Sequence, residues 1–299
     1  MAQQTDGPWT VERVLNWTRG FFERKALDAP RLSAELILSH VLALPRIGLY
    51  TNYQRPLEDE QLSALRGLVK RAGDEEPIAY LTGRQHFFNL EFKVTPDVLI
   101  PRPDSELLVE QVQALGRHTP GFEAPRVLDL CTGSGCVAIA IAYHNKAANV
   151  IATDLSEAAL AVAKENVGRH NVADRVTLLR GDLFAALDGY VDPSPFDVIT
   201  ANPPYIATAQ LAGLPKNVRD YEPRLALDGG PDGLGPHRRI LDGAPARLRR
   251  GGRIFVEIAF DQPDAALALF DGRPAFEQPR VLRDHAGQPR VLTAVRSDA

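Results

Sequence analysis

Hydrophobic positions in the first 75 residues recur every three to four residues, which is the spacing of amphipathic helices. The pattern predicts three short helices that pack into a small helical domain over residues 1–75. Taken alone, it indicates no chemistry. The three sets are Val11, Val14, Leu15 and Phe22; Leu32, Leu36 and Val41; and Leu62, Leu65 and Val69.

The pattern changes over residues 76–98, where short apolar runs are interrupted by turn residues. Gly83, Asn89 and Pro96 interrupt a run of closely spaced apolar residues, which are Phe87, Phe88, Leu90, Phe92 and Val94. Short strand-like runs rich in aromatic residues and separated by turn residues are typical of a β-hairpin. We expect this hairpin to link the helical domain to a second domain over residues 99–299.

Strand-like and helix-like segments alternate through the rest of the chain. This order predicts an α/β fold with a doubly wound, mostly parallel sheet of seven strands. The last two strands lie close enough in sequence to form an antiparallel hairpin at the sheet edge. Strands are expected at 126–130, 150–154, 176–179, 196–201, 253–260, 279–283 and 291–296, and helices at 136–143, 156–167 and 238–248.

Composition narrows the classes of function. Hydrophobic residues make up 44% of the 299 residues and charged residues 24%, as in globular proteins that bury a core. The net charge of -4 offers no general attraction to phosphate backbones, so no direct nucleic-acid contact is expected. Two cysteines five positions apart, no signal segment and no long apolar run indicate a cytoplasmic protein outside the membrane. Nothing calls for assembly, so we expect a monomer.

Small residues follow the first predicted strand of the sheet. Cys131, Thr132, Gly133, Ser134 and Gly135 form a loop between strand 126–130 and the next helix, where a ligand could approach the backbone and the helix amino terminus. Nineteen residues after Gly135, the second strand ends on Asp154, whose carboxylate could accept both hydroxyl hydrogens of a ribose. The combination predicts a site for an adenosine-containing cofactor.

The loop favours S-adenosylmethionine over a dinucleotide. A dinucleotide loop has the spacing G-x-G-x-x-G, but Cys131 stands at the first glycine position and no third glycine follows in phase. Asp129, just before the loop, would repel a pyrophosphate and would suit the ammonium group of a methionine moiety. We therefore expect S-adenosylmethionine and no metal.

A third acid, Asp182, follows strand 176–179. Its carboxylate could accept a hydrogen bond from an adenine amino group while Leu183 packs on the ring. The spacing alone supports equally a second interpretation, in which Asp182 caps the following helix.

Strand 196–201 runs directly into Asn202, Pro203, Pro204 and Tyr205. The two prolines make a rigid turn, so the Asn202 side-chain oxygen and a turn carbonyl could hold both hydrogens of an NH2 group while Tyr205 stacks on its plane. Two acceptors would aim a weakly nucleophilic amide nitrogen at a methyl donor. Asn202, Pro203 and Tyr205 are therefore the expected catalytic residues, and no general base is required.

These motifs resemble those of the release-factor glutamine N5-methyltransferase family, whose members modify the glutamine of the Gly-Gly-Gln motif in peptide chain release factors. The likeness covers the chain from about residue 75 onward. It implies that Cys131 to Gly135, Asp154, Leu183 and Asn202 contact the cofactor, that Asn202 to Tyr205 hold the glutamine, and that the helical domain helps to grip the release factor. It is carried by segments 77–83, 99–106, 129–135, 202–205, 218–227 and 229–234.

Two departures and two alternatives accompany this resemblance. The family usually has Gly at the position of Cys131 and Glu-Thr-Glu where this chain has Asp104, Ser105 and Glu106. The loop also resembles that of a sister family that methylates a glutamine of a large-subunit ribosomal protein. Methylation of an adenine amine is a further alternative, although it would need a basic and aromatic recognition surface. Arg102 and Glu106 are either a surface ion pair or help to close the cofactor site.

Overall fold

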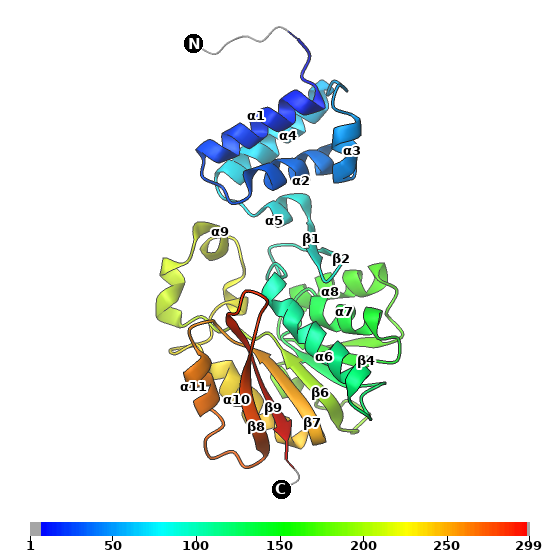
Figure 1. Ribbon diagram of the computed structural model, residues 1–299, viewed down its shortest axis with the longest axis vertical. Helices are drawn as coiled ribbons and strands as arrows, with labels where there is room; N and C mark the ends of the chain where they lie inside the picture. Colours follow the sequence, from blue (N-terminus) through cyan, green and yellow to red (C-terminus); the bar gives the residue numbers. More distant parts are fainter. Residues whose placement is uncertain (1–6, 298–299) are drawn as a thin grey trace. The chain divides into compact units, whose positions relative to one another are not determined.

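The structure is a computed structural model that describes residues 7–297, and it divides into two compact units (Figure 1). The first unit comprises Met1–Arg84 and the second Gln85–Ala299. The division falls inside the hairpin segment 76–98. Each unit has its own hydrophobic core, and each is described separately below.

The first unit is entirely helical within its described residues. The predicted faces around Val11 and Leu65 are buried, but the predicted face of the second helix is wrong. Leu32 is 39% exposed there, whereas Ile37 and Leu38 are buried, because the helix packs through the neighbouring stripe. The sequence pattern also missed two short helices. The helices are α1 (Val11–Arg24), α2 (Pro30–Leu42), α3 (Arg46–Thr51), α4 (Asp59–Gly73) and α5 (Ile78–Thr82).

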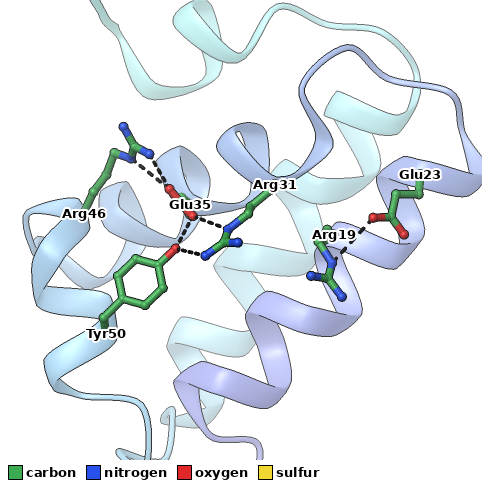
Figure 2. A network of polar contacts seen from close by, with 6 residues as sticks. All are labelled: Arg19, Glu23, Arg31, Glu35, Arg46 and Tyr50. Atoms are coloured by element: carbon green, nitrogen blue, oxygen red, sulfur yellow. Dashed lines mark hydrogen bonds and ion pairs between the residues drawn. The ribbon is translucent and has the colours of Figure 1, made fainter.

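A buried carboxylate joins α2 to α3 (Figure 2). Glu35 of α2 accepts hydrogen bonds from Arg31 at 3.0 Å, from Arg46 at 2.5 Å and from the Tyr50 hydroxyl. Burial raises the pKa of Glu35, but the hydrogen bonds from Tyr50, Arg46 and Arg31 outweigh this and lower it. The ionised side chain therefore fixes α3 against α2. Arg19 and Glu23 form a separate surface pair on α1.

The predicted hairpin is present as two short paired strands, β1 (Arg84–Phe87) and β2 (Leu90–Lys93). Phe88 and Asn89 form its turn with φ values of 47° and 61°. Two consecutive residues with positive φ are typical of the tight turns that match the twist of a hairpin. Buried Asn166 then anchors β2, because its side chain pairs with both backbone groups of Lys93.

The second unit contains a seven-stranded sheet in the order β5-β4-β3-β6-β7-β9-β8. Strands β3 to β7 are parallel to one another, and β9 runs antiparallel to β7 and to β8. The antiparallel pairing of the last two strands at the sheet edge confirms the prediction. The strands are β3 (Arg126–Leu130), β4 (Asn149–Asp154), β5 (Val176–Arg180), β6 (Phe196–Ala201), β7 (Leu248–Glu257), β8 (Phe276–Arg283) and β9 (Pro289–Arg296).

Helices cover both faces of this sheet (Figure 1). Along β3, Val127 packs into one core and Leu128 and Leu130 into the other, as strand alternation requires. The first core is completed by α6 (Glu106–His118), α7 (Cys136–His144) and α8 (Glu157–Arg169). The second is completed by α10 (Gly235–Gly243) and α11 (Pro263–Ala268). Helix α9 (Lys216–Arg219) lies in the long connection after β6.

Helix α7 is apolar all round, from Cys136 to Ala142. Such a helix is stable in a globular protein only when protein surrounds it, and here the sheet, α6 and α8 do so. It has 9 residues. Among residues 7–297, no helix combines the length and apolar character needed to cross a membrane.

One helix–strand boundary differs from the prediction. The predicted helix 238–248 ends at Gly243, a 3-10 turn follows at Ala244–Ala246, and the predicted strand 253–260 begins earlier, at Leu248. Arg249 lies in β7 and forms an ion pair with Asp197 of β6. The end of the helix at Gly243 was not predicted, because apolar residues continue at helical spacing on both sides of that glycine.

Candidate functional site

A cavity of about 420 Å³ lies at the carboxyl ends of strands β3 to β6 in the second unit. Parallel α/β sheets place ligand sites at this edge, where neighbouring loops diverge. Three residues predicted for the site, Gly135, Pro203 and Tyr205, lie outside the cavity lining. The predicted residues that line it are Cys131, Thr132, Gly133, Ser134, Asp154, Asp182, Leu183, Asn202 and Pro204.

The loop after β3 is tightly wound. Cys131, Gly133 and Gly135 have φ values of 58°, 56° and 81°, a backbone region that favours glycine. A Cβ on Gly135 would meet the side chain of Ile139 at 3.0 Å, so this glycine permits close packing at the start of α7. A Cβ on Gly133 would meet nothing within 4 Å, because this residue faces open space.

Asp154, at the end of β4, holds the loop in place. Its Oδ2 accepts the Gly133 amide hydrogen at 2.8 Å, and its Oδ1 accepts that of Ser156 at 2.9 Å. Burial raises the pKa of Asp154, and these two backbone donors partly offset that increase. Each carboxylate oxygen has a second lone pair, so the side chain can still accept hydrogen bonds from a ligand in the cavity.

Asp129 lies on the cavity wall at the centre of the sheet. Its carboxylate accepts hydrogen bonds from the hydroxyls of Thr132 at 2.6 Å and Thr200 at 2.7 Å. Burial raises its pKa to about 6, even though both hydroxyls favour the ionised form. Asp129 thus joins the loop after β3 to strand β6 and places negative charge beside the cavity.

Asp182 follows β5 and lines the cavity together with Leu183. Its carboxylate pairs with Arg239 of α10 at 2.8 Å, and it makes no side-chain hydrogen bond to the 3-10 turn that follows. Leu183 is buried with a φ of 51°. Asp182 thus occupies the N-cap position of that turn without capping it through its side chain. The contact of Asp182 and Leu183 with an adenine ring stays a prediction.

The turn after β6 is held from several sides. Asn202 Nδ2 donates to the hydroxyl of Ser105 at 2.9 Å, and the Tyr205 hydroxyl donates to Glu257 at 3.3 Å. The Tyr205 carbonyl accepts from the Gln262 amide at 3.0 Å. Burial raises the pKa of Tyr205 above its usual range, so the phenol stays protonated at neutral pH. The turn is rigid, and Asn202 and Pro204 face the cavity.

Sequence reasoning missed two buried residues beside this turn, Ser105 and Glu257. Ser105 donates to Glu257 Oε2 at 2.5 Å, and each residue is at most 2% exposed. Glu257 could have been noticed as a lone charge inside the apolar run Ile254 to Ile258, because charged residues are rarely buried without a partner. Pairing with Ser105, which is 152 positions away, has no local signal.

Arg102 and Glu106 do not form a pair with each other. Arg102 lines the cavity and forms an ion pair with buried Glu222 of the connection after β6. Glu106 accepts the Phe88 amide hydrogen at 2.8 Å and so anchors the turn of the β1–β2 hairpin. Only Arg102 is therefore placed to act at the cavity.

The chemistry of the cavity suits a cationic ligand with hydroxyl groups. Five aspartates line it against two arginines, Arg102 and Arg239, so the net negative charge of the lining would repel a pyrophosphate. The aspartates are Asp97, Asp129, Asp154, Asp182 and Asp228. The residues present therefore fit S-adenosylmethionine.

Comparison with protein families agrees with this geometry. The family model described as the PrmC N-terminal domain matches residues 13–83, and the model described as the methyltransferase small domain matches residues 103–214. The second match includes strands β3 to β6 and every predicted cofactor residue.

Individual relatives match almost the whole chain. A release factor glutamine methyltransferase of Geobacter sulfurreducens is 44% identical over 95% of this chain and 96% of the relative. A release factor glutamine methyltransferase of Rhodopirellula baltica is 40% identical over 96% of this chain and 97% of the relative. Among solved structures, a release-factor-specific protein-(glutamine-N5) methyltransferase of Alicyclobacillus acidocaldarius is 31% identical, covers 69% of this chain and 99% of its own, and has a TM-score of 0.40. A methyltransferase of Pyrococcus furiosus, 19% identical with a TM-score of 0.50, covers 79% of this chain and 99% of its own and shares the fold.

Proposed function

Because the chain belongs to the release factor glutamine methyltransferase family, we propose that it transfers a methyl group to the N5 atom of the glutamine in the Gly-Gly-Gln motif of peptide chain release factors. The observation that carries this proposal is the position of Asn202 and Pro204 on the lining of the same cavity as the loop after β3. The turn can thereby present an amide nitrogen to a ligand held by that loop.

S-adenosylmethionine is the proposed cofactor. When bound, it supplies a methyl group that its sulfonium charge already activates. The backbone from Cys131 to Gly135, with its open face at Gly133, would accommodate the methionine portion. Asp154 would accept hydrogen bonds from the ribose hydroxyls, and Asp182 with Leu183 would contact the adenine.

The turn would hold the glutamine side chain. Asn202 Oδ1 would accept one amide hydrogen and the carbonyl of Pro203 the other, so that the nitrogen is aimed and its lone pair freed from conjugation. Tyr205 would stack on the amide plane, and its phenol is fixed by Glu257. The nitrogen becomes acidic as it gains the methyl group, so its proton can leave to water without a general base.

The remaining proposals concern the protein substrate, the oligomeric state and the cellular location of the enzyme. Class 1 release factors are the proposed protein substrate, and the helical unit would take part in gripping them. The enzyme would act as a monomer in the cytoplasm, where translation terminates, and would make no direct contact with nucleic acid. The excess of five aspartates over two arginines on the cavity lining supports the last point, because net negative charge opposes phosphate groups.

Label transfer tests the substrate directly. Labelled methyl would be offered with three substrates: a release factor, its Gln→Ala variant in the Gly-Gly-Gln motif, and the proteins of a large ribosomal subunit. We expect label on the intact release factor alone. Label only on a ribosomal protein would retain the chemistry and overturn the proposed substrate.

A further inference from the structure

The turn after β6 has a second layer of hydrogen bonds that orients the side chain of Asn202. Asn202 Nδ2 donates to Ser105 Oγ at 2.9 Å, and Ser105 Oγ donates to Glu257 Oε2 at 2.5 Å. Asn202 Oδ1 accepts no hydrogen bond from any residue in the part of the chain that the structure describes, and Asn202 lines the cavity. The chain Glu257–Ser105–Asn202 thus ends on one oxygen available to a substrate.

The direction of these bonds follows from counting protons. A hydroxyl carries one hydrogen, and an ionised carboxylate can only accept. When Glu257 is ionised, the single hydrogen of Ser105 is committed to it, so Ser105 can only accept from Asn202. The Asn202 amide must then turn its NH2 group toward Ser105 and its oxygen away from it.

We infer that Ser105 and Glu257 are positioning residues that hold Asn202 with its side-chain oxygen toward the substrate amide. The inference rests on the proposed function for the identity of that substrate. If the amide were reversed, its NH2 group would face the NH2 group of the glutamine, and two donors would oppose each other. Correct orientation of Asn202 therefore determines whether the substrate nitrogen is held for transfer.

Protonation of Glu257 would release this constraint. The hydrogen of Ser105 would then be free to bond Asn202 Oδ1, and the reversed amide would compete. Burial raises the pKa of Glu257 to about 7, with a further increase from Asp104 and opposing effects from Ser105, Tyr205 and Arg290.

Two other titratable groups lie near Glu257. His237, which contacts the Glu257 carbonyl at 2.8 Å, has a pKa lowered by burial to about 4, and burial raises that of Cys136 to about 12, so both stay neutral near pH 7.

The test compares wild type with Ser105→Ala, Ser105→Thr and Glu257→Gln, using a release factor as substrate. Ser105→Ala should lower kcat about ten- to a hundredfold, while the cofactor Kd changes less than about twofold. This loss is smaller than the roughly hundred- to thousandfold cost of removing a transition-state hydrogen-bond partner outright, because Asn202 itself remains. Ser105→Thr keeps the hydroxyl and should have a kcat close to that of wild type.

The pH dependence of kcat gives a second comparison. The wild-type kcat should fall as pH decreases through about 7, and Ser105→Ala and Glu257→Gln should lack this dependence. Wild-type kcat in Ser105→Ala, or an unchanged acidic limb in either variant, would overturn the inference.

A second measurement does not depend on methyl transfer. In protein labelled with ¹⁵N at asparagine, the Asn202 NH2 signals, assigned with Asn202→Asp, should titrate with a midpoint near 7. They should not do so in Glu257→Gln. Absence of this titration in a folded wild type would contradict the positioning role, whereas its presence without label on a release factor would contradict only the proposed function. Thermal unfolding of each variant confirms that it is folded.

Discussion

Gly233 lies directly against the backbone carbonyl of Tyr205, and a Cβ placed on Gly233 would meet that oxygen at 2.3 Å. The same Cβ would meet the Gln262 amide nitrogen, which donates to this carbonyl, at 2.6 Å. A Cβ placed on Gly229 would likewise meet the Pro204 carbonyl oxygen, at 2.7 Å. The glycine-rich segment 229–234 therefore packs closely against the backbone of the turn after β6, and glycine is needed at Gly229 and Gly233 because a side chain would displace that turn.

Gly233→Ala should displace the Tyr205 carbonyl and with it the turn. We expect kcat to fall at least about tenfold, because displacements well below 1 Å disturb an aligned reaction. Gly230→Ala is the matched control, since Gly230 also has a positive φ, of 89°, but its Cβ would meet nothing within 4 Å. Kinetics of both variants separate displacement of the turn from backbone strain. Equal activity losses in the two would show that the contact with Tyr205 is unimportant.

Cys131 occupies a backbone conformation that glycine adopts without strain, with a φ of 58°. Left-handed backbone costs a non-glycine residue roughly 1–2 kcal/mol, although glycine loses more entropy on folding. Cys131→Gly should therefore raise the free energy of unfolding by up to about 1 kcal/mol, and β-branched Cys131→Val should lower it by at least about that amount. Urea unfolding of the three proteins measures both changes. A stable Cys131→Val protein would be incompatible with strain at this position.

Cofactor affinity should depend on the ionisation of Asp129. Its pKa of about 6 in the free protein is raised by burial, and a bound cation would favour the ionised form. The affinity should thus be constant above about pH 7 and fall by up to tenfold for each pH unit below about 6.

The free energy of unfolding depends on pH in the opposite sense, because the Asp129 carboxyl binds its proton more tightly in the folded protein than in the unfolded chain. Asp129's contribution to stability is complete below pH 3.8 and is lost as the pH rises through about 6.

Calorimetric titration of S-adenosylmethionine at several pH values tests this dependence. Asp129→Asn should bind the cofactor more weakly at pH 8 and should lose most of the pH dependence. An affinity in wild type that is flat between pH 5 and pH 8 would exclude Asp129 as the responsible group.

The ion pair between Arg102 and Glu222 joins the segment before α6 to the connection after β6. The Glu222 side chain is 1% exposed, and its Oε2 has no partner among residues 7–297. Arg102→Ala would leave this carboxylate buried without its cation and should lower the free energy of unfolding by about 3 kcal/mol. Addition of Glu222→Gln should recover part of the loss. Chemical unfolding of the single and double variants provides the measurement, and a single variant as stable as wild type would argue against the pair.

Local patterns were sufficient to predict most of the sheet. Strands such as Arg126–Leu130 and Phe196–Ala201 are apolar runs that end in turn residues, and the structure has them at the predicted bounds. The cavity edge was also predictable, because parallel strands bring the loops after β3, β4, β5 and β6 together. Asp154 and Asn202 both line the cavity for that reason.

Features that depend on distant pairing could not be read from local patterns. Leu32 has helical spacing but is exposed, since the buried stripe of α2 is decided by which helices surround it. Ser105 is 152 positions from Glu257 and 97 from Asn202, so no local pattern encodes its hydrogen bonds to them. Arg249 likewise gains its partner, Asp197, from the neighbouring strand and not from its own helix-like surroundings.

Mass spectrometry of the methylated product tests the central claim most directly. A release factor would be incubated at saturating cofactor with wild type or with Asn202→Ala, and fragmentation of its Gly-Gly-Gln peptide would locate any methyl group. We predict one methyl group on the glutamine side-chain nitrogen with wild type and almost none with Asn202→Ala, although that variant stays folded. A methyl group on another atom, or full methylation by Asn202→Ala, would contradict the account.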